Sequence, residues 1–164
     1  MFIFMNKTDF QKLTLLKLIF HTTPDSTFSH LSQQMDLSQR TIERYLKDIE
    51  TDCQAIPELK DFYFKKIDSH ITAIFPNNLS PHYISDRLHV SYTEKSIEFN
   101  IIRTLLLKKF NSLNELADEL FISPSSLYRL LYKLEPMMEK FDIDFSFFDS
   151  HSDLNIHYDE KKLR

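Results

Sequence analysis

Apolar residues between positions 28 and 50 recur at the spacing of two short α-helices, with a polar break between them. The positions expected to face inward are Leu31, Met35, Ile42, Leu46 and Ile49. The break is Asp36-Leu37-Ser38, and Ser38 can cap the second helix because its hydroxyl accepts an unpaired backbone N–H there. Two short helices joined by a three-residue turn predict a helix-turn-helix, whose second helix fits the DNA major groove.

The second of these helices leaves a polar, net-basic face outward. Its candidate DNA contacts are Gln39, Arg40, Thr41, Glu43, Arg44 and Lys47. Four of them share one side of the helix, because they are three or four positions apart: Arg40, Glu43, Arg44 and Lys47. Arginine can bind guanine through two hydrogen bonds and glutamate can accept one from cytosine. Gln39 and Thr41 lie near the helix N-terminus, where they can hold phosphates.

The flanking segments predict a winged helix-turn-helix domain. A first helix is expected over Thr8–Phe20, with Thr8 as its cap and a wide apolar face. Residues 61–75 change to strand alternation around Asp68-Ser69-His70, which predicts a β-hairpin with a short polar turn. Lys65 and Lys66 of this wing suit contacts with the DNA backbone.

A connector is expected to follow the polar stretch Pro76-Asn77-Asn78. Ser80-Pro81 predicts the start of a short helix that ends at about Leu88. Ser91-x-x-Glu94 has the pattern of a capping box and predicts a long helix that ends at Phe110. The resulting domains are residues 1–78, a connector over 79–90, and residues 91–164.

The first unit then recurs in the sequence. Ser112-x-x-Glu115 is another capping box, and Ile122-Ser123 repeats Leu37-Ser38. The matching positions are 85 residues apart without a gap, as in 129 − 44 = 85. A second hairpin is expected from Phe145 to Tyr158, with Asp149-Ser150-His151 as its turn. The fold class is therefore mainly α with small β-hairpin wings: two tandem winged helix-turn-helix domains joined by a helical connector.

The second unit presents a different surface. The candidate DNA contacts on its second helix are Ser125, Ser126, Tyr128, Arg129, Tyr132 and Lys133. This face has fewer charges and more aromatic surface, and the second wing is acidic. We therefore expect the first module to supply more of the affinity.

Each of these patterns also has a purely structural interpretation. A stripe with Arg and Lys is what any solvated helix face looks like. Arg44 and Arg129 could pair with a nearby acid instead of DNA, and Tyr128 and Tyr132 could cover the edge of the core. The histidines show no metal spacing, so His70 and His151 are expected to be turn residues, and Cys53 to be a small buried residue.

Composition limits the possible functions. The net charge is −4, which is unusual for a DNA-binding domain, although affinity depends on the cations at the contact face. The chain has no glycine, which excludes glycine-rich phosphate loops, and its single cysteine fits a reducing, cytoplasmic location. The start MFIFM is too short for a signal peptide or a membrane span, and either Met1 or Met5 is the true start. No catalytic group, cofactor, metal or small-molecule substrate is indicated, and no membrane association.

The segments LSQRTIERYLKDIE and ISPSSLYRLLYKLE, with the helix start SIEFNIIRTLL, resemble the N-terminal DNA-binding half of the Mga family. These proteins are the M-protein trans-acting positive regulators of Gram-positive bacteria. The resemblance implies a transcriptional regulator that binds promoter DNA through both modules. Family members usually continue into phosphotransferase-regulated domains and a dimerising domain. The chain is therefore expected to be a fragment or a short relative, and a homodimer would form through C-terminal parts beyond Arg164.

Three functions agree with these patterns. The first is a sequence-selective binder of double-stranded DNA that acts in transcription. The second is a protein-interaction adaptor, because winged helices also serve that role and the chain is acidic. The third is a plasmid replication initiator, a class in which tandem winged helices also occur.

Overall fold

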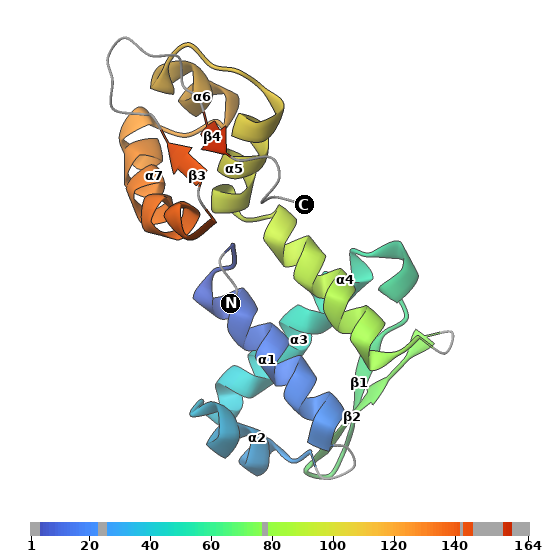
Figure 1. Ribbon diagram of the computed structural model, residues 1–164. Coiled ribbons are helices and arrows are strands. Elements are labelled where there is room, and N and C mark those ends of the chain that lie inside the picture. The colour runs from blue at the N-terminus through green and yellow to red at the C-terminus, as the bar shows by residue number, and fades with distance from the viewer. Residues whose placement is uncertain (1–3, 23–25, 77–78, 142, 146–155, 159–164) are drawn as a thin grey trace. The chain divides into compact units, whose positions relative to one another are not determined.

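The computed structural model describes residues 4–22, 26–76, 79–141, 143–145 and 156–158. The chain forms two compact units, Met1–Glu94 and Lys95–Arg164. It is mainly helical, with small antiparallel pairs of strands, as the sequence predicts (Figure 1).

The first unit contains four helices and a hairpin. Its elements are α1 (Lys7–Thr22), α2 (Phe28–Met35), α3 (Gln39–Gln54), the 3-10 turn η1 (Pro57–Leu59), β1 (Tyr63–Ile67), β2 (His70–Ile74) and α4 (Pro81–Glu94). The prediction that Thr8 caps α1 is wrong. The Asp9 backbone N–H donates to the Asn6 side-chain oxygen at 2.9 Å, so Asn6 provides the cap and the helix begins one residue earlier than Thr8.

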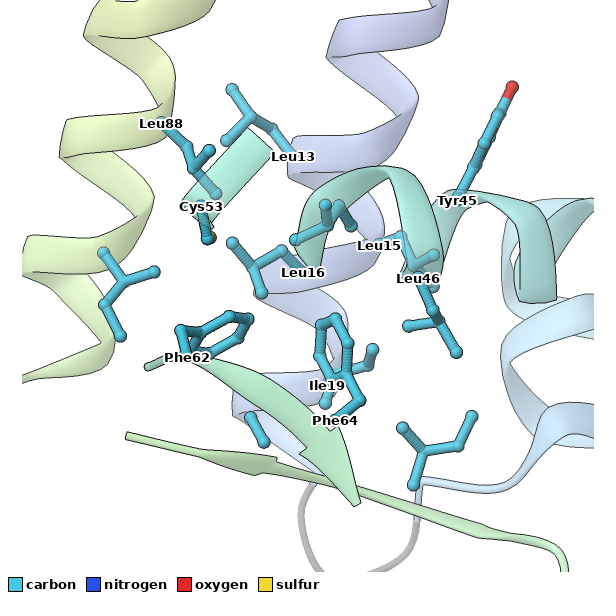
Figure 2. Close-up of a cluster of buried hydrophobic side chains, with 14 of the residues drawn as sticks. Leu13, Leu15, Leu16, Ile19, Tyr45, Leu46, Cys53, Phe62, Phe64 and Leu88 are labelled. Carbon is cyan, nitrogen blue, oxygen red and sulfur yellow. The ribbon is translucent and has the colours of Figure 1, made fainter. Parts of the chain in front are cut away.

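One apolar core holds the first unit together. Leu13, Leu16 and Ile19 of α1 are buried and face the inward side of α3, including Leu46 and Cys53 (Figure 2). Ile42 and Ile49, predicted to face inward, are fully buried. Burying such side chains contributes roughly 1.5–3 kcal/mol each, which fixes α3 with its other face toward solvent.

The hairpin closes one end of this core. Phe64 pairs with Ala73 across the strands, and both are buried, whereas Ile67 at the tip is 54% exposed. The turn is Asp68-Ser69, with Asp68 in the left-handed region (φ 54°), and His70 belongs to β2 and not to the turn as predicted. Asp tolerates this backbone conformation better than most residues.

Backbone hydrogen bonds join the tip of the hairpin to the start of α2. Thr27 forms an isolated antiparallel bridge with His70. The Phe28 N–H donates to the Ser69 carbonyl (3.3 Å), and the Ile71 N–H donates to the Ser26 carbonyl (2.8 Å). The hairpin therefore has a defined position beside the helix-turn-helix, although it is distant from it in sequence.

The predicted helix start at Ser91 is wrong. Ile84, Leu88 and Tyr92 are buried at spacings of four, so one apolar stripe runs through Ser91 and α4 continues to Glu94. Ser96 caps the next helix instead, accepting the Phe99 N–H at 3.3 Å. The C-terminal end of α4 therefore lies six residues beyond the predicted end at Leu88, since 94 − 88 = 6.

A partly buried polar network joins α4 to α1 and α3. The Lys12 ammonium lies 2.7 Å from Asp52 and 2.8 Å from Asp9, and the Tyr92 hydroxyl donates to Asp52 at 2.7 Å. Burial by itself lowers the pKa of Lys12, but the hydrogen bonds to Asp52 and Asp9 outweigh it and raise the pKa above its ordinary value. Lys12 therefore stays charged, and α4 is part of the first unit's structure.

The second unit repeats the helical part of the first. Its elements are α5 (Ile97–Leu107), α6 (Leu113–Glu119), α7 (Pro124–Met138), the 3-10 turn η3 (Glu139–Phe141), β3 (Ile143–Phe145) and β4 (Ile156–Tyr158). The predicted end of the long helix at Phe110 is wrong, because α5 ends at Leu107. Phe110 is buried beyond that end, so its apolar character reflects packing and not helix.

Strands β3 and β4 pair antiparallel, with Phe145 opposite Ile156. The first strand begins at Ile143, two residues before the predicted start at Phe145. The predicted turn Asp149-Ser150-His151 and the neighbouring positions Phe147, Phe148 and Leu154 lie outside the described residues.

Candidate nucleic-acid interface

The first helix-turn-helix is held by caps at both helix starts. The Thr27 hydroxyl accepts the His30 N–H at 3.2 Å, and the Ser38 hydroxyl accepts the Thr41 N–H at 3.2 Å. Between the helices, Asp36 is left-handed (φ 51°). The next N–H, of Leu37, donates to the Ser32 carbonyl at 3.1 Å and closes the end of α2. The predicted cap at Ser38 is confirmed.

The second helix-turn-helix has the same geometry at positions 85 later. The Ser112 hydroxyl accepts the Glu115 N–H at 3.2 Å, and Ser123 accepts the Ser126 N–H at 3.2 Å. Phe121 is left-handed (φ 55°), as Asp36 is. The Ile122 N–H donates to the Ala117 carbonyl at 3.0 Å, matching the Leu37 bond. The repeat in the sequence is therefore also a repeat in backbone conformation and hydrogen bonding.

The inward sides of α3 and α7 match as well. Ile42, Leu46 and Ile49 of α3 correspond to Leu127, Leu131 and Leu134 of α7. Each of these six side chains is at most 2% exposed. Because equivalent positions of the two helices are buried, their remaining positions, which point to solvent, are equivalent as well.

One side of α3 carries Arg40, Glu43, Arg44 and Lys47, as predicted. Together with Thr41 these residues are called the α3 face. All are exposed except Thr41, which is half-buried. With Ser38 they line one open depression on the surface. Gln39 is also exposed at the helix start. None of the three cations has an ion-pair partner among the described residues, and the Arg44 guanidinium lies 5.3 Å from the centre of the neighbouring Tyr45 ring. Arg40 and Lys47 are therefore available to an anionic partner, and Arg44 is exposed beside the Tyr45 ring without an ion pair.

The α7 face differs from the α3 face in its chemistry. It is defined as Ser125, Ser126, Tyr128, Arg129 and Tyr132. Tyr128 is 42% exposed and Tyr132 is 56% exposed, so neither ring is enclosed by the core. Arg129 is exposed and donates to the Ser126 hydroxyl at 3.3 Å. Neither Arg129 nor Arg44 is buried in an ion pair within the described part of the chain.

Lys133 differs from the other predicted cationic contacts because it forms an ion pair with an acidic side chain. Its ammonium lies 2.8 Å from the Glu98 carboxylate of α5. Partial burial by itself raises the pKa of Glu98, but hydrogen bonds from Lys133, a backbone N–H and Ser96 outweigh it and lower the pKa. Sequence analysis missed this pair, because Glu98 and Lys133 are 35 positions apart and on different helices.

The two lysines of the first hairpin face opposite sides of the strand. Lys65 and Lys66 are both exposed, and neighbouring residues of a strand alternate. The Lys66 ammonium lies 5.3 Å from the centre of the Phe28 ring, at the start of α2. Lys65 is the better placed of the two for a phosphate, because Lys66 already lies over an aromatic ring.

The two units do not differ in net charge. Each carries ten Lys and Arg and twelve Asp and Glu, so each is −2. What differs is the placement of the cations: three lie on the α3 face and one on the α7 face. An acidic chain can therefore still carry a net-basic face on one helix.

Cys53 is the one cysteine of the chain, and its side chain is fully buried. Burial, reinforced by Asp52 and Glu50, raises the pKa of Cys53 to about 12, so the thiol stays protonated. In the part of the chain that the structure describes, no three His, Cys, Asp or Glu side chains gather as a metal site would require. Over the same residues, no helix has both the length and the apolar content to cross a membrane.

Comparison with known families identifies the second helix-turn-helix. The family model of the Mga helix-turn-helix domain matches residues 77–164, which include α4 and the second helix-turn-helix. The chain belongs to the Mga helix-turn-helix family. This is a family of DNA-binding regulators. A comparison with curated proteins finds no match. The matched range covers the copy whose recognition helix has fewer outward charges, and the first helix-turn-helix lies outside it.

Proposed function

We propose that this Mga-family chain is a transcriptional regulator that binds promoter double-stranded DNA through two winged helix-turn-helix modules. In this proposal α3 and α7 each enter a major groove, and α4 connects the modules. The observation that carries it is the exposed arginine at the same place on two helices of the same geometry, Arg44 and Arg129. A helix capped and turned in this way presents its outward side chains to base edges.

The α3 face supports the larger electrostatic contribution. Arg40, Arg44 and Lys47 are exposed and have no ion-pair partner within the described residues, so they can replace counterions at phosphates or bind guanine. Glu43 is the one acid among them and suits the amino group of cytosine. Gln39 and Thr41 lie at the α3 N-terminus, where the helix dipole favours phosphate.

The hairpin of the first unit serves as a wing in this proposal. Lys65 would contact the DNA backbone from a position fixed by the bonds between the hairpin tip and α2. In this proposal the chain acts as a cytoplasmic regulator without catalysis or cofactor.

A salt titration of duplex binding tests the proposal. The chain is mixed with a labelled random-sequence duplex and with duplexes enriched from a random pool, and affinity is followed by anisotropy. Three to five neutralised phosphates give a slope of log K against log salt of about −3 to −4.5. Arg44→Ala and Arg129→Ala should weaken binding to the enriched duplex, whereas the exposed Arg103→Ala in α5 is a matched control. Absence of binding at low salt, or no enrichment from the pool, would contradict the proposal.

A protein-interaction adaptor is the second candidate. Phe121 is 96% exposed at the turn before α7, and Leu107 is 72% exposed at the end of α5. Exposed apolar side chains of this size suit a protein contact. If the chain binds no duplex in the titration above, this function is favoured instead.

A further inference from the structure

The α7 face places two aromatic rings where a groove-binding helix makes its contacts. Tyr128 and Tyr132 are one helical turn apart, and Arg129 is adjacent to the first. Their exposed fractions, 42% and 56%, show that the rings extend beyond the packed core. Each ring is therefore partly covered by the protein and partly open to a partner.

The corresponding positions of α3 are polar. Tyr128 matches Glu43 and Tyr132 matches Lys47, each 85 positions earlier on a helix with the same caps and buried side. The difference between the faces is therefore one of side-chain chemistry at equivalent sites, and it should correspond to a difference in the base pairs that each helix prefers.

The surroundings of the tyrosines favour a nucleic acid over a protein partner. The exposed neighbours on the α7 face are Ser125 and Arg129. These hydroxyl and cationic groups suit phosphates and bases. A protein-docking patch would instead be expected to form a continuous apolar area.

Only one group on base edges of the major groove is apolar, the C5 methyl of thymine. We propose that Tyr128 and Tyr132 contact thymine methyl groups, so that the second module selects A·T pairs while the α3 face selects by charge and hydrogen bonds. This inference rests on the proposed function. It adds the class of base pair that the second recognition helix prefers.

The inference is tested by removing the methyl group and keeping the base pair. Duplexes enriched by the wild-type chain are synthesised with thymine and with uracil, which lacks only that methyl. The wild type should bind the uracil duplex about fourfold more weakly for each methyl group that a tyrosine ring covers. Tyr128→Ser with Tyr132→Ser should bind the thymine duplex more weakly and show almost no difference between the two duplexes. Tyr128→Phe with Tyr132→Phe should restore the difference, because the ring and not the hydroxyl covers the methyl group.

Two controls make the outcomes distinct. Tyr83→Ser removes a tyrosine of α4 with a similar exposed fraction, 40%, and should keep the wild-type ratio of thymine to uracil binding. Arg44→Ala should lower both affinities and leave the ratio unchanged. Equal binding of both duplexes by the wild type, or a full ratio in the double serine variant, overturns the inference and leaves the proposed function standing. Failure to bind any duplex overturns the proposed function and the inference with it.

Discussion

The two recognition helices share a structural frame, meaning their caps, turn and buried positions, and differ in their outward side chains. The caps, the left-handed turn residue and the buried positions of α3 recur in α7. At the outward positions, Arg40, Glu43 and Lys47 are replaced by Ser125, Tyr128 and Tyr132, and only the arginine at 44 and 129 is kept. The frame is thus constrained by packing and hydrogen bonds, whereas the outward face is free to vary with the partner.

The arginines give the largest expected effect. Arg44→Ala should weaken binding to an enriched duplex by about 1–3 kcal/mol, or roughly five- to 150-fold, because it removes a base-reading side chain from a group of unpaired cations. Arg129→Ala should weaken binding less, since the α7 face holds fewer cations. Both are measured by anisotropy, with circular dichroism to confirm the fold. A larger effect of Arg129→Ala than of Arg44→Ala would reverse the comparison.

The caps should have equal effects in the two copies. Ser38→Ala and Ser123→Ala each remove a hydroxyl that accepts a backbone N–H at 3.2 Å, and each should lower the free energy of unfolding by about 1 kcal/mol. Chemical denaturation followed by circular dichroism measures both. Destabilisation in one copy only would show that the shared frame is not equally important in the two modules.

The turn residues should respond differently. Phe121 has φ 55° and an exposed ring, so Phe121→Gly should raise the free energy of unfolding by up to about 1 kcal/mol through relief of the left-handed strain. Asp36→Gly should change it by a few tenths, since Asp tolerates this region. The same denaturation series checks both variants, and destabilisation by Phe121→Gly would mean that the ring contributes to folding.

The wing lysines give a smaller effect. Lys65→Ala should flatten the salt slope by about 1 and weaken binding to all duplexes equally, because a phosphate contact carries no sequence information. Lys66→Ala should change the slope less, since its ammonium already lies over Phe28. A changed sequence preference in Lys65→Ala would instead place this side chain at a base.

The smallest effect concerns the ion pair of Glu98 and Lys133. The pKa of Glu98 is lowered from 4.5 in the folded chain, so the pair stabilises the fold above that pH and the stabilisation disappears as the pH falls through the lowered value. Glu98→Gln should reduce the decline in stability as the pH falls below 4.5. It should also free Lys133 and raise random-duplex affinity about twofold at neutral pH. Unchanged acid unfolding would show that the pair is too exposed to contribute.

Local patterns in the sequence predicted the frame well. Ser38, Ser112 and Ser123 are caps as expected, and the apolar positions of α3 and α7 are buried, because both features depend on residues within one or two helical turns. The pattern at Ser91-x-x-Glu94 failed for a related reason. Tyr92 is buried against α1 and α3, and this tertiary packing continues α4 through a residue that would otherwise begin a helix.

The candidate site was harder to predict than the frame. Sequence spacing places Arg44 and Arg129 outward, and both are exposed in the structure. It gives no sign that Lys133 pairs with Glu98 or that Lys66 lies over Phe28, since both contacts join segments far apart in the chain. Contacts of this kind decide which exposed cations are free for a partner, and they depend on the folded structure.

A hydroxyl-radical footprint on a duplex enriched from a random pool tests the central claim most directly. The proposal predicts two protected segments, one absent in Arg44→Ala and the other in Arg129→Ala, with the remaining segment retained in each variant. A single protected segment that disappears in Arg44→Ala and is unaffected by Arg129→Ala would contradict it, because only one of the two helices would then contact DNA.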